Sequence, residues 1–494
     1  MSILSKALDF LRHEGGNVAT IFSIALLPVA AIGGGAIDFS QAMNARGRLA
    51  EALDSAALAV GSQDGLNAAD AESLAMEFIT ANYPTREIGT VQSIDIFNDN
   101  DSGVVRITGQ SRVATTLLGI IGMDYITVDW TSEVVRAQNA LELVMVLDNT
   151  GSMSGSKIRA LREAALTLNN MLHDIATEPG SVRVGLVPFA ASVNVGTRFE
   201  RAWWLDADAE HPLHSEWFEP AVNRWDMFDT LRGEEWDGCV EAREMPMDID
   251  DTPPNRRSPN TLFVPYFAPD EPDQGRYANN YIDDESRAGD PVTLIMNSDK
   301  YLSASPGRGG PNRGCTTTPI TALTSNRDEL DSALRAMEAS GTTNIAMGVS
   351  WGIRVISPQE PFTEGVDYDE PNTIKAMVIL TDGENVIPTA GAPLHSEYTS
   401  YGYLTTGRLG ITSASRVQAN RAMNARTEVA CEHARQEGIR VYTISFGDVD
   451  EDTRDLMSGC ASHPSLYFNS PTPESLQAAF ELIAGDLSNL RISR

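Results

Sequence analysis

The sequence LELVMVLDNTGSMS, residues 141–154, decides the fold. Its first half, LELVMVL (141–147), is a nearly continuous apolar run, which is typical of a parallel strand buried on both faces of a sheet. The polar motif DNTGSMS (148–154) follows at once, and a helical pattern covers 156–175. The stretch therefore predicts a strand, a loop rich in oxygen donors, and a helix.

The same succession of strand and helix continues toward the carboxyl end. Further apolar runs are VRVGLVPF (182–189), AMVIL (376–380) and IRVYTISF (439–446). Helical patterns lie near 326–338, 345–355, 415–437 and 473–488. This alternation predicts an α/β domain over 139–494 with a doubly wound, mostly parallel sheet.

A large insertion, at about 200–320, interrupts the alternation. Within it, residues 201–300 hold five of the seven tryptophans and ten of the twenty-five prolines. The same block has 23 acidic and 9 basic residues, so it contributes −14 of the net charge of −31. Two interpretations stay open: a recognition surface, because tryptophan is favoured at contact hot spots, or tryptophans that pack the insertion onto the parent domain.

Three polar loops belong together in the predicted sheet domain. They are DNTGSMS, Gly341–Asn344 ahead of a helix, and Thr381–Gly383 directly after AMVIL. In an open α/β sheet, ligands bind beyond the carboxyl ends of the strands, at the point where the strand order reverses. We expect these loops to meet there.

The oxygen donors of the three loops are suited to a hard divalent cation. They are the carboxylates and hydroxyls of Asp148, Thr150, Ser152, Thr343 and Asp382. Such oxygens favour Mg²⁺, although Ca²⁺ or Mn²⁺ could use the same set, and the absence of His and Cys argues against zinc. Two carboxylates leave positive character at the ion, so a carboxylate from a partner could fill one position.

The amino-terminal part contains a segment of membrane-spanning length. Residues 18–37 include no charged side chain, and twenty helical residues span about 30 Å, which is roughly the hydrocarbon thickness. Lys6, Arg12 and His13 precede the run, which predicts a cytoplasmic amino end and a body across the membrane. The alternative is a cleaved signal peptide.

A helical pattern continues from the apolar run through residues 38–61. Its apolar residues at helical spacing predict one buried stripe. The members of that stripe are Phe39, Met43, Ala50, Leu53, Ala57 and Val60. Gly33, Gly34 and Gly35 would permit the close approach of another helix, or else provide flexibility at the membrane exit.

Residues 63–138 are expected to form a small α+β region. A helix is predicted at about 64–84, followed by strands in SIDIF (93–97), GVVRITG (103–109), RVATTLL (112–118) and YITVDWTSEVVR (125–136). The segment NDNDSG (98–103) is expected to be a hairpin tip; its Asp99 and Asp101 also resemble part of a calcium loop.

Composition excludes several classes of function. A net charge of −31 and a pI near 4.5 argue against nucleic-acid binding, because the phosphate backbone is repelled.

His211 and His214, near Asp206 and Asp208, are an alternative pair of metal ligands. The sequence has no HExxH, Walker A or GxSxG motif, so we expect a protein that is not an enzyme.

The residues of the three loops resemble the von Willebrand factor A domain and its metal-ion-dependent adhesion site (MIDAS). The resemblance implies that Asp148, Thr150, Ser152, Thr343 and Asp382 are the metal-site residues, with Thr343 the least secure. The chain further resembles TadE/TadG-like pilus-assembly proteins of the Flp (tight adherence) system. That likeness is carried by GGNVATIFSIALLPVAAIGGGAIDFSQ (15–41), WDGCVEAR (236–243), TTNIAMGVSWG (342–352) and LTDGEN (380–385).

These resemblances imply a membrane-anchored adhesion or pilus-assembly protein. It would have an anchor with a pilin-like helix over 1–62, a small α+β region over 63–138, and an A domain over 139–494. The body would lie in the periplasm, attached to the bacterial inner membrane or incorporated in a pilus. Its partners would be pilus subunits, assembly proteins or an external acidic surface, besides membrane lipid. The alternative is a membrane-tethered A-domain co-chaperone of an AAA-type ATPase.

Four cysteines allow three disulfide connectivities, or four reduced thiols. The resemblance to TadG-like proteins favours Cys239–Cys315 and Cys431–Cys460, in which each bridge closes its own segment. An exported body would permit such bridges, whereas a cytosolic co-chaperone would keep the thiols reduced.

Overall fold

The computed structural model describes residues 16–492, apart from 64–65, 85–88, 100–103, 136–139, 177, 274–276, 285–288, 308 and 390–393. Side chains at 16–20, 23, 27–33, 135 and 492 also lie outside the description. The chain divides into two compact units. Unit 1 comprises 1–138 and 492–494, and unit 2 comprises 139–491; each is described by itself.

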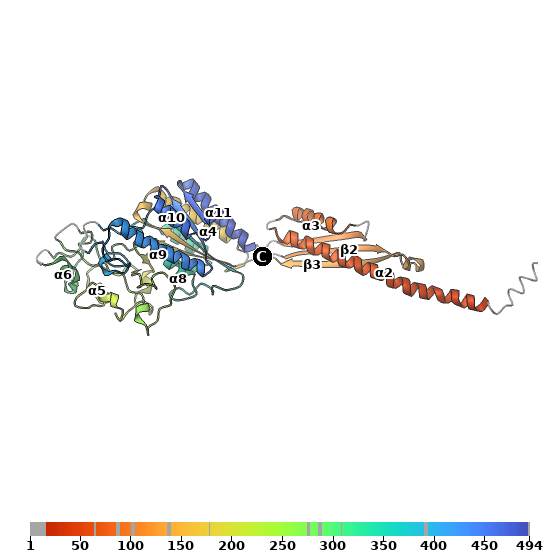
Figure 1. The fold of residues 1–494 in the computed structure, drawn as a ribbon, viewed down its shortest axis with the longest axis horizontal. Helices are drawn as coiled ribbons and strands as arrows, with labels where there is room; N and C mark the ends of the chain where they lie inside the picture. The colour runs from red at the N-terminus through yellow and green to blue at the C-terminus, as the bar shows by residue number, and fades with distance from the viewer. Residues whose placement is uncertain are drawn as a thin grey trace, which may run out of the picture. The chain divides into compact units, whose positions relative to one another are not determined.

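Unit 1 consists of one long helix, one shorter helix and a three-stranded antiparallel sheet (Figure 1). Its elements are α2 (Gly16–Gly61), α3 (Ala68–Asn82), β1 (Thr90–Asp99), β2 (Val104–Ala114), η1 (Leu118–Ile121) and β3 (Tyr125–Val135). The strand order is β1-β2-β3, and α2 packs against β2 and β3. The expected continuation of the apolar run into a second helical stretch is confirmed, because α2 is unbroken.

The buried face of α2 differs from the predicted stripe. Leu53, Ala57 and Val60 are buried as expected, but Phe39 and Met43 are 57% and 39% exposed. The buried apolar side chains described along the helix are Ala42, Ala45, Leu49, Ala52, Leu53, Ala56, Ala57 and Val60. Alanines dominate this face because a short side chain lets the helix lie close to the sheet, so the largest apolar residues do not mark it.

The sheet of unit 1 has three strands where the sequence suggested four. The segments expected as separate strands at 103–109 and 112–118 form one strand, β2, which pairs with β3 without interruption from Val104↔Val135 to Ala114↔Tyr125. Gly109 does not break it: a Cβ there would lie 3.0 Å from Leu53 Cδ1, so glycine makes room for α2. Residues 100–103 of the expected hairpin tip, with Asp101, lie outside the described residues.

The predicted membrane segment is only partly described. Lys6, Arg12 and His13 lie outside the described residues, as do many side chains of 18–37. Within the portion of the chain that the structure describes, no helix is both long and apolar enough to cross a membrane.

Unit 2 is built on a mixed sheet of eight strands with a parallel centre. Its strands are β4 (Ala140–Asp148), β5 (Val182–Phe189), β6 (Val193–Asn194), β7 (Cys239–Val240), β8 (Thr321–Thr324), β9 (Thr373–Thr381), β10 (Arg440–Phe446) and β11 (Tyr467–Ser470). The order is β11-β10-β9-β4-β5-β6-β7, with β8 also on β5. The five strands from β11 to β5 are parallel, as the apolar runs predicted, and the three short strands are antiparallel.

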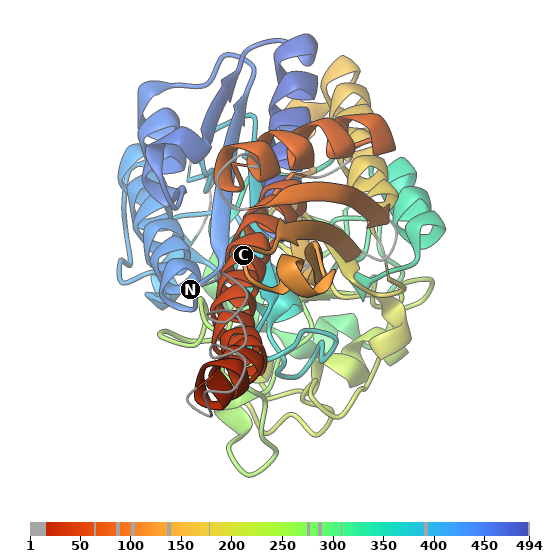
Figure 2. The ribbon, with the colours of Figure 1, turned by 90° about the vertical axis from the view of Figure 1, so that its right-hand side faces the viewer.

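Helices cover both faces of this sheet (Figure 2). The helices of unit 2 are α4 (Ser156–Asp174), α5 (Arg224–Thr230), α6 (Pro291–Met296), α7 (Arg327–Ala336), α8 (Ile345–Ile356), α9 (Arg416–Gln436), α10 (Glu451–Cys460) and α11 (Pro473–Ile492). Alternate residues of β4 point to opposite cores: Leu143 and Met145 pack with α4, α7 and α11, whereas Val144 and Val146 pack with α8, α9 and α10. Helix α8 lies close to the sheet because Gly348 has no Cβ, which would meet the Phe189 ring at 2.6 Å.

The insertion is packed onto the sheet domain through its aromatic residues. Trp204, Trp225 and Trp236 are at most 4% exposed and belong to the same core as Val144 and Val146 of β4. Of the two interpretations of the insertion, the structure therefore favours the one in which its tryptophans pack onto the parent domain.

The chain also contains both disulfides that the resemblance implied, Cys239–Cys315 and Cys431–Cys460.

Candidate metal centre

The candidate site lies where the strand order of unit 2 reverses. From β4 the chain proceeds to β5 on one side, and the later strands β9, β10 and β11 are added on the other. β4 ends at Asp148 and β9 ends at Thr381, and the two strands are in register at Leu147↔Leu380. Loops that follow these neighbouring strands therefore emerge side by side, as expected at a ligand-binding switch point.

Asp148 is fully buried, and its carboxylate is held by groups from both loops. One oxygen, Oδ1, accepts the Thr150 backbone N–H at 2.8 Å. The other, Oδ2, accepts the Thr381 hydroxyl at 2.7 Å and the Asp382 backbone N–H at 3.4 Å. These contacts fix the orientation of the carboxylate.

Three further predicted donors form a chain of hydrogen bonds. The Thr150 and Ser152 hydroxyls lie 2.9 Å apart, and the Ser152 hydroxyl donates to Asp382 Oδ1 at 2.5 Å. Thr150 and Asp382 are buried, whereas Ser152, in the short helix η2 (Gly151–Met153), is exposed. The oxygens are thus gathered at one place, and Ser152 lies at its solvent side.

Thr343 is placed beside this group by its loop. The Gly151 N–H donates to the Gly341 carbonyl at 3.0 Å, which holds the loop ahead of α8 against the first motif. Thr343 is 5% exposed, and its carbonyl accepts the Val386 N–H at 2.9 Å. The hydrogen bonds described among the other four predicted ligands do not include its hydroxyl, so the structure brings the loop of Thr343 to the site through Gly341 and leaves its role as a ligand a prediction.

Lys157, which the sequence reasoning missed, also reaches the site. It stands in the first turn of α4, and its Nζ lies 2.6 Å from Asp382 Oδ2. Gly447, with φ of +83°, makes room for it, because a Cβ there would lie 3.3 Å from the ammonium. The basic residue three positions after Ser154 was a signal that could have been noticed.

The electrostatics of the group fit a cation. Burial, and then the nearby charge of Asp382, raise the pKa of Asp148 above its usual value, because two carboxylates in a dry site repel each other. Both polar atoms of the buried Asn149 amide also lack a hydrogen-bond partner among the described residues. A hard divalent ion would relieve the repulsion, and carboxylate and hydroxyl oxygens are the donors it prefers. The residues present therefore fit a Mg²⁺-type ion.

The alternative pair of histidines is not a metal site. His214 uses both ring nitrogens: Nε2 donates to the Asp206 carbonyl at 3.1 Å, and Nδ1 accepts the Arg224 N–H at 3.1 Å. His211 Nδ1 accepts the Leu213 N–H at 3.1 Å. Both imidazoles are buried and stabilise the insertion locally. Across the described residues, no cluster of three or more His, Cys, Asp or Glu side chains is suited to a metal; the candidate centre itself has two carboxylates and completes its donor set with hydroxyls.

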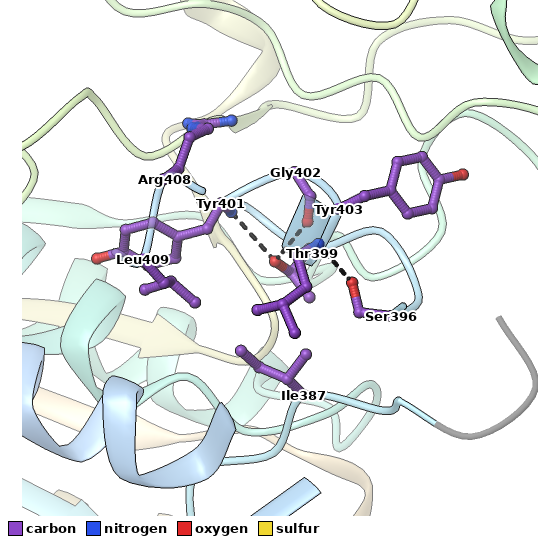
Figure 3. A pocket seen from close by; sticks show the side chains of 9 residues that line it. Ile387, Ser396, Thr399, Tyr401, Gly402, Tyr403, Arg408 and Leu409 are labelled. Atoms are coloured by element: carbon purple, nitrogen blue, oxygen red, sulfur yellow. Dashed lines mark hydrogen bonds between the residues drawn. The ribbon is translucent and has the colours of Figure 1, made fainter. Parts of the chain in front are cut away.

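A cavity in unit 2 is part of the packed interior. It lies between Ile387 and the segment 396–409 and has no room for a water molecule. Figure 3 shows three hydrogen bonds within its lining: the Thr399 hydroxyl donates to the Gly402 carbonyl at 3.1 Å and accepts the Tyr401 N–H at 3.2 Å, and Ser396 Oγ accepts the Leu404 N–H at 2.8 Å. This cavity offers no place for a ligand.

Comparison with known families identifies the amino-terminal segment. Residues 16–64, which include the whole of α2, match the model of the family described as putative Flp pilus-assembly TadE/G-like. The chain thus carries a TadE/G-like segment, as the sequence resemblance indicated. No curated protein matches the chain.

Several solved structures are similar to the chain at low identity. The pilus adhesin SpaC from Lactobacillus rhamnosus GG has 11% identity and a TM-score of 0.33, over 81% of this chain and 34% of SpaC. The vWF domain of the type V pili tip protein Mfa5 from Porphyromonas gingivalis has 11% identity and a TM-score of 0.34, over 72% of this chain and 97% of that domain. Proximal thread matrix protein 1 from the mussel byssus, with a zinc-occupied MIDAS motif, has 10% identity and a TM-score of 0.29, over 72% of this chain and 47% of that protein. The chain spans about a third of the SpaC structure.

Proposed function

We propose that the chain is a membrane-anchored pilus-assembly or adhesion protein of the Flp (Tad) type that binds a partner through a divalent cation. The observation that carries the proposal is the hydrogen-bonded group of Asp148, Thr150, Ser152 and Asp382 at the switch point of the sheet. The Lys157 ammonium contacts Asp382, whereas the buried Asp148 carboxylate is held by neutral donors, so a divalent cation would compensate the charge that remains. The role is binding rather than catalysis.

The residues of the site have separate tasks in this proposal. Asp148 and Asp382 would supply the negative charge, and Thr150, Ser152 and Thr343 would supply neutral oxygens. Bound Mg²⁺ supplies a Lewis-acidic centre that can accept one more hard oxygen ligand. Because Ser152 is exposed, a carboxylate on a partner could approach from that side. The partner would be another pilus subunit, an assembly protein or an external acidic surface.

The proposed location is the bacterial inner membrane, with the body in the periplasm or incorporated in a pilus. Residues 18–37 would form a single-pass anchor, since they carry no charge and belong to the segment that matches the TadE/G-like family. The two disulfides support an exported body, because cytosolic thiols are kept reduced. The same bridges disfavour the co-chaperone of an AAA-type ATPase, and non-reducing peptide mapping distinguishes the two locations.

The proposal is tested with the full chain and its Asp148→Asn variant. Asn keeps the size of the side chain and removes the charge, so the variant should fold as the wild type does, which circular dichroism and thermal unfolding would check. We expect calorimetry to find one Mg²⁺ site in the wild type and none in the variant. Retention of pilus proteins during purification from native cells should be lost in the variant and in chelator. Retention that is unchanged in both would contradict the proposal.

A further inference from the structure

The turn between β2 and β3 carries large apolar side chains that are open to solvent. Residues 115–123 have the sequence TTLLGIIGM, which contains no charged residue. The exposed fractions are 73% for Ile120, 57% for Ile121, 51% for Met123 and 59% for Tyr125 at the start of β3. Large apolar side chains that gather on an exposed connection between strands usually mark an interaction site, so this cluster requires an explanation.

This turn is fixed to α2 at one level of the helix. Asp38 is 1% exposed, and its carboxylate accepts the backbone N–H groups of the turn. The three bonds come from Thr116 at 3.0 Å, Leu117 at 2.9 Å and Leu118 at 2.7 Å. At Gly34, a Cβ would lie 2.4 Å from Leu117 Cβ, so only glycine admits the turn there. The glycines at 34 and 35 thus serve close approach, by a turn rather than by a second helix.

The turn contacts α2 at Asp38, which directly follows the uncharged residues 18–37. Beyond it, toward the amino end, α2 continues as a lone helix past the tip of the hairpin (Figure 1). The eighteen residues from Gly16 to Gly33 extend for about 27 Å, close to the thickness of the hydrocarbon core. Along this stretch, the described large apolar side chains are more than half exposed: Ile21, Phe22, Ile24 and Leu26.

We propose that the turn at 117–123, together with Tyr125, is a second membrane contact. It would lie in the headgroup and upper acyl region of the leaflet from which the anchor emerges. The inference rests on the proposed anchoring by residues 18–37. A lipid surface is the occupant that the chemistry favours, because the cluster is apolar, contains a tyrosine and lies at the level of Ile37 and Phe39, which are 54% and 57% exposed on α2.

The hydrogen bonds that surround the Asp38 carboxylate support the assignment of the turn as a membrane contact. A carboxylate at a membrane boundary is costly unless its charge is satisfied by hydrogen bonds. Hydrogen bonds from the backbone N–H groups of Leu118 and Thr116 lower the pKa of Asp38, so the carboxylate stays ionised while these donors surround it. The turn therefore covers Asp38, the first acidic residue after the uncharged run. The surface that it exposes there is formed by Ile120 and Ile121 instead of the carboxylate.

The test uses fluorescent labels at single introduced cysteines in the full chain. All four native cysteines are in disulfides, so an introduced thiol is the only one that reacts. Met123→Cys reports on the turn, Leu26→Cys on the anchor, and Leu58→Cys, 61% exposed at the far end of α2, is the matched control. Each protein carries the dye NBD and is reconstituted in phosphatidylcholine vesicles that contain lipids spin-labelled at the upper acyl chain.

We expect the label at 123 to show a blue shift, quenching by the spin-labelled lipid and loss of quenching by aqueous iodide, as at 26 and unlike at 58. Adding Ile120→Glu and Ile121→Glu should reverse the shift at 123. Lipid quenching at 26 combined with iodide quenching at 123 would overturn this inference and leave the anchor intact. Iodide quenching at both positions would overturn both. A blue shift at 123 that grows with protein density, without lipid quenching, would overturn the inference in favour of a contact between copies of the chain.

Discussion

At the scale of single residues, Lys157 is the feature that most directly tunes the candidate metal centre. Its ammonium forms an ion pair with Asp382 Oδ2 at 2.6 Å. This positive charge therefore competes with a metal ion for the Asp382 carboxylate. Lys157→Met should therefore strengthen Mg²⁺ binding by roughly 1–2 kcal/mol, or about five- to thirtyfold, because it removes a like charge whose repulsion of the ion lies between the ~1 kcal/mol of bulk water and the ~4 kcal/mol of a pair near a protein surface. Titration calorimetry measures the change.

The matched control for this prediction is Arg159→Met, which removes the same charge from an exposed position on the same helix. It should alter Mg²⁺ affinity much less than the Lys157 variant does. Equal effects of the two variants would mean that only net charge matters and that the contact with Asp382 has no specific role.

A second residue-scale prediction concerns pH. Burial, with the charges of Arg408 and Arg224, lowers the pKa of His211 to about 4, and burial with Arg224 lowers the pKa of His214 to about 3. Between pH ~6.5 and these values the unfolded chain binds protons that the folded chain does not, so the free energy of unfolding decreases as pH falls, by on the order of 1.4 kcal/mol per pH unit and histidine.

Urea unfolding of unit 2 at a series of pH values between about 6.5 and 5 measures this slope. The wild type is compared with His214→Gln and with His463→Gln, a change at an exposed histidine. Only the first variant should reduce the slope. An identical slope in all three proteins would refute the structural role given to His214.

Sequence reasoning reached most of the site at this scale because the chemistry of the ligands is visible in the motif. Asp148, Ser152 and Asp382 follow strands that are plain from their apolar runs, and the structure brings them together. Lys157 was missed although it stands three positions after Ser154, because a basic residue in a first helical turn is usually solvated; only the folded structure brings its ammonium to Asp382.

At the scale of elements, the packing of the hairpin turn on α2 depends on Gly34. Gly34→Ala should destabilise unit 1 by about 1–3 kcal/mol, because the new Cβ would lie 2.4 Å from Leu117 Cβ and the turn would have to move. The backbone N–H groups of residues 116–118 donate hydrogen bonds to Asp38. Hydrogen exchange at these amides should therefore become faster in the variant, and mass spectrometry or NMR would measure the change.

Gly47 of the same helix provides the control, since a Cβ there meets nothing within 4 Å. Gly47→Ala should stabilise unit 1 by about 0.5–1 kcal/mol through helix propensity. Protection at 116–118 that is the same in both variants would show that the turn does not depend on this close approach.

The elements that were predictable are those whose burial dominates their sequence. β4, β5, β9 and β10 are continuous apolar runs in a parallel sheet, and their identity followed directly. The strands β6, β7 and β8 have two to four residues and pair through positions that tertiary contacts select, so no pattern marks them. The inner face of α2 was predicted correctly toward its carboxyl end and wrongly at Phe39 and Met43, because alanines face the sheet there.

At the scale of the whole molecule, the two disulfides are expected to contribute strongly to the stability of unit 2. The bridges close segments of 76 and 29 residues. In the chain-entropy model such loops correspond to roughly 4.5 and 3.5 kcal/mol. Replacing Cys239 and Cys315 by alanine should therefore lower the free energy of unfolding more than replacing Cys431 and Cys460, as chemical denaturation would measure. The reverse order would indicate that strain or residual structure outweighs loop length.

The central claim is that three separated loops of unit 2 hold one hard divalent cation. Crystals of the full chain grown with Mn²⁺, which can replace Mg²⁺ and scatters anomalously, test it most directly. The account predicts one anomalous peak among the oxygens of Asp148, Thr150, Ser152 and Asp382, and its disappearance in Asp148→Asn. An empty site at saturating Mn²⁺, or a peak elsewhere in unit 2 with these four side chains still bonded to one another, would contradict it.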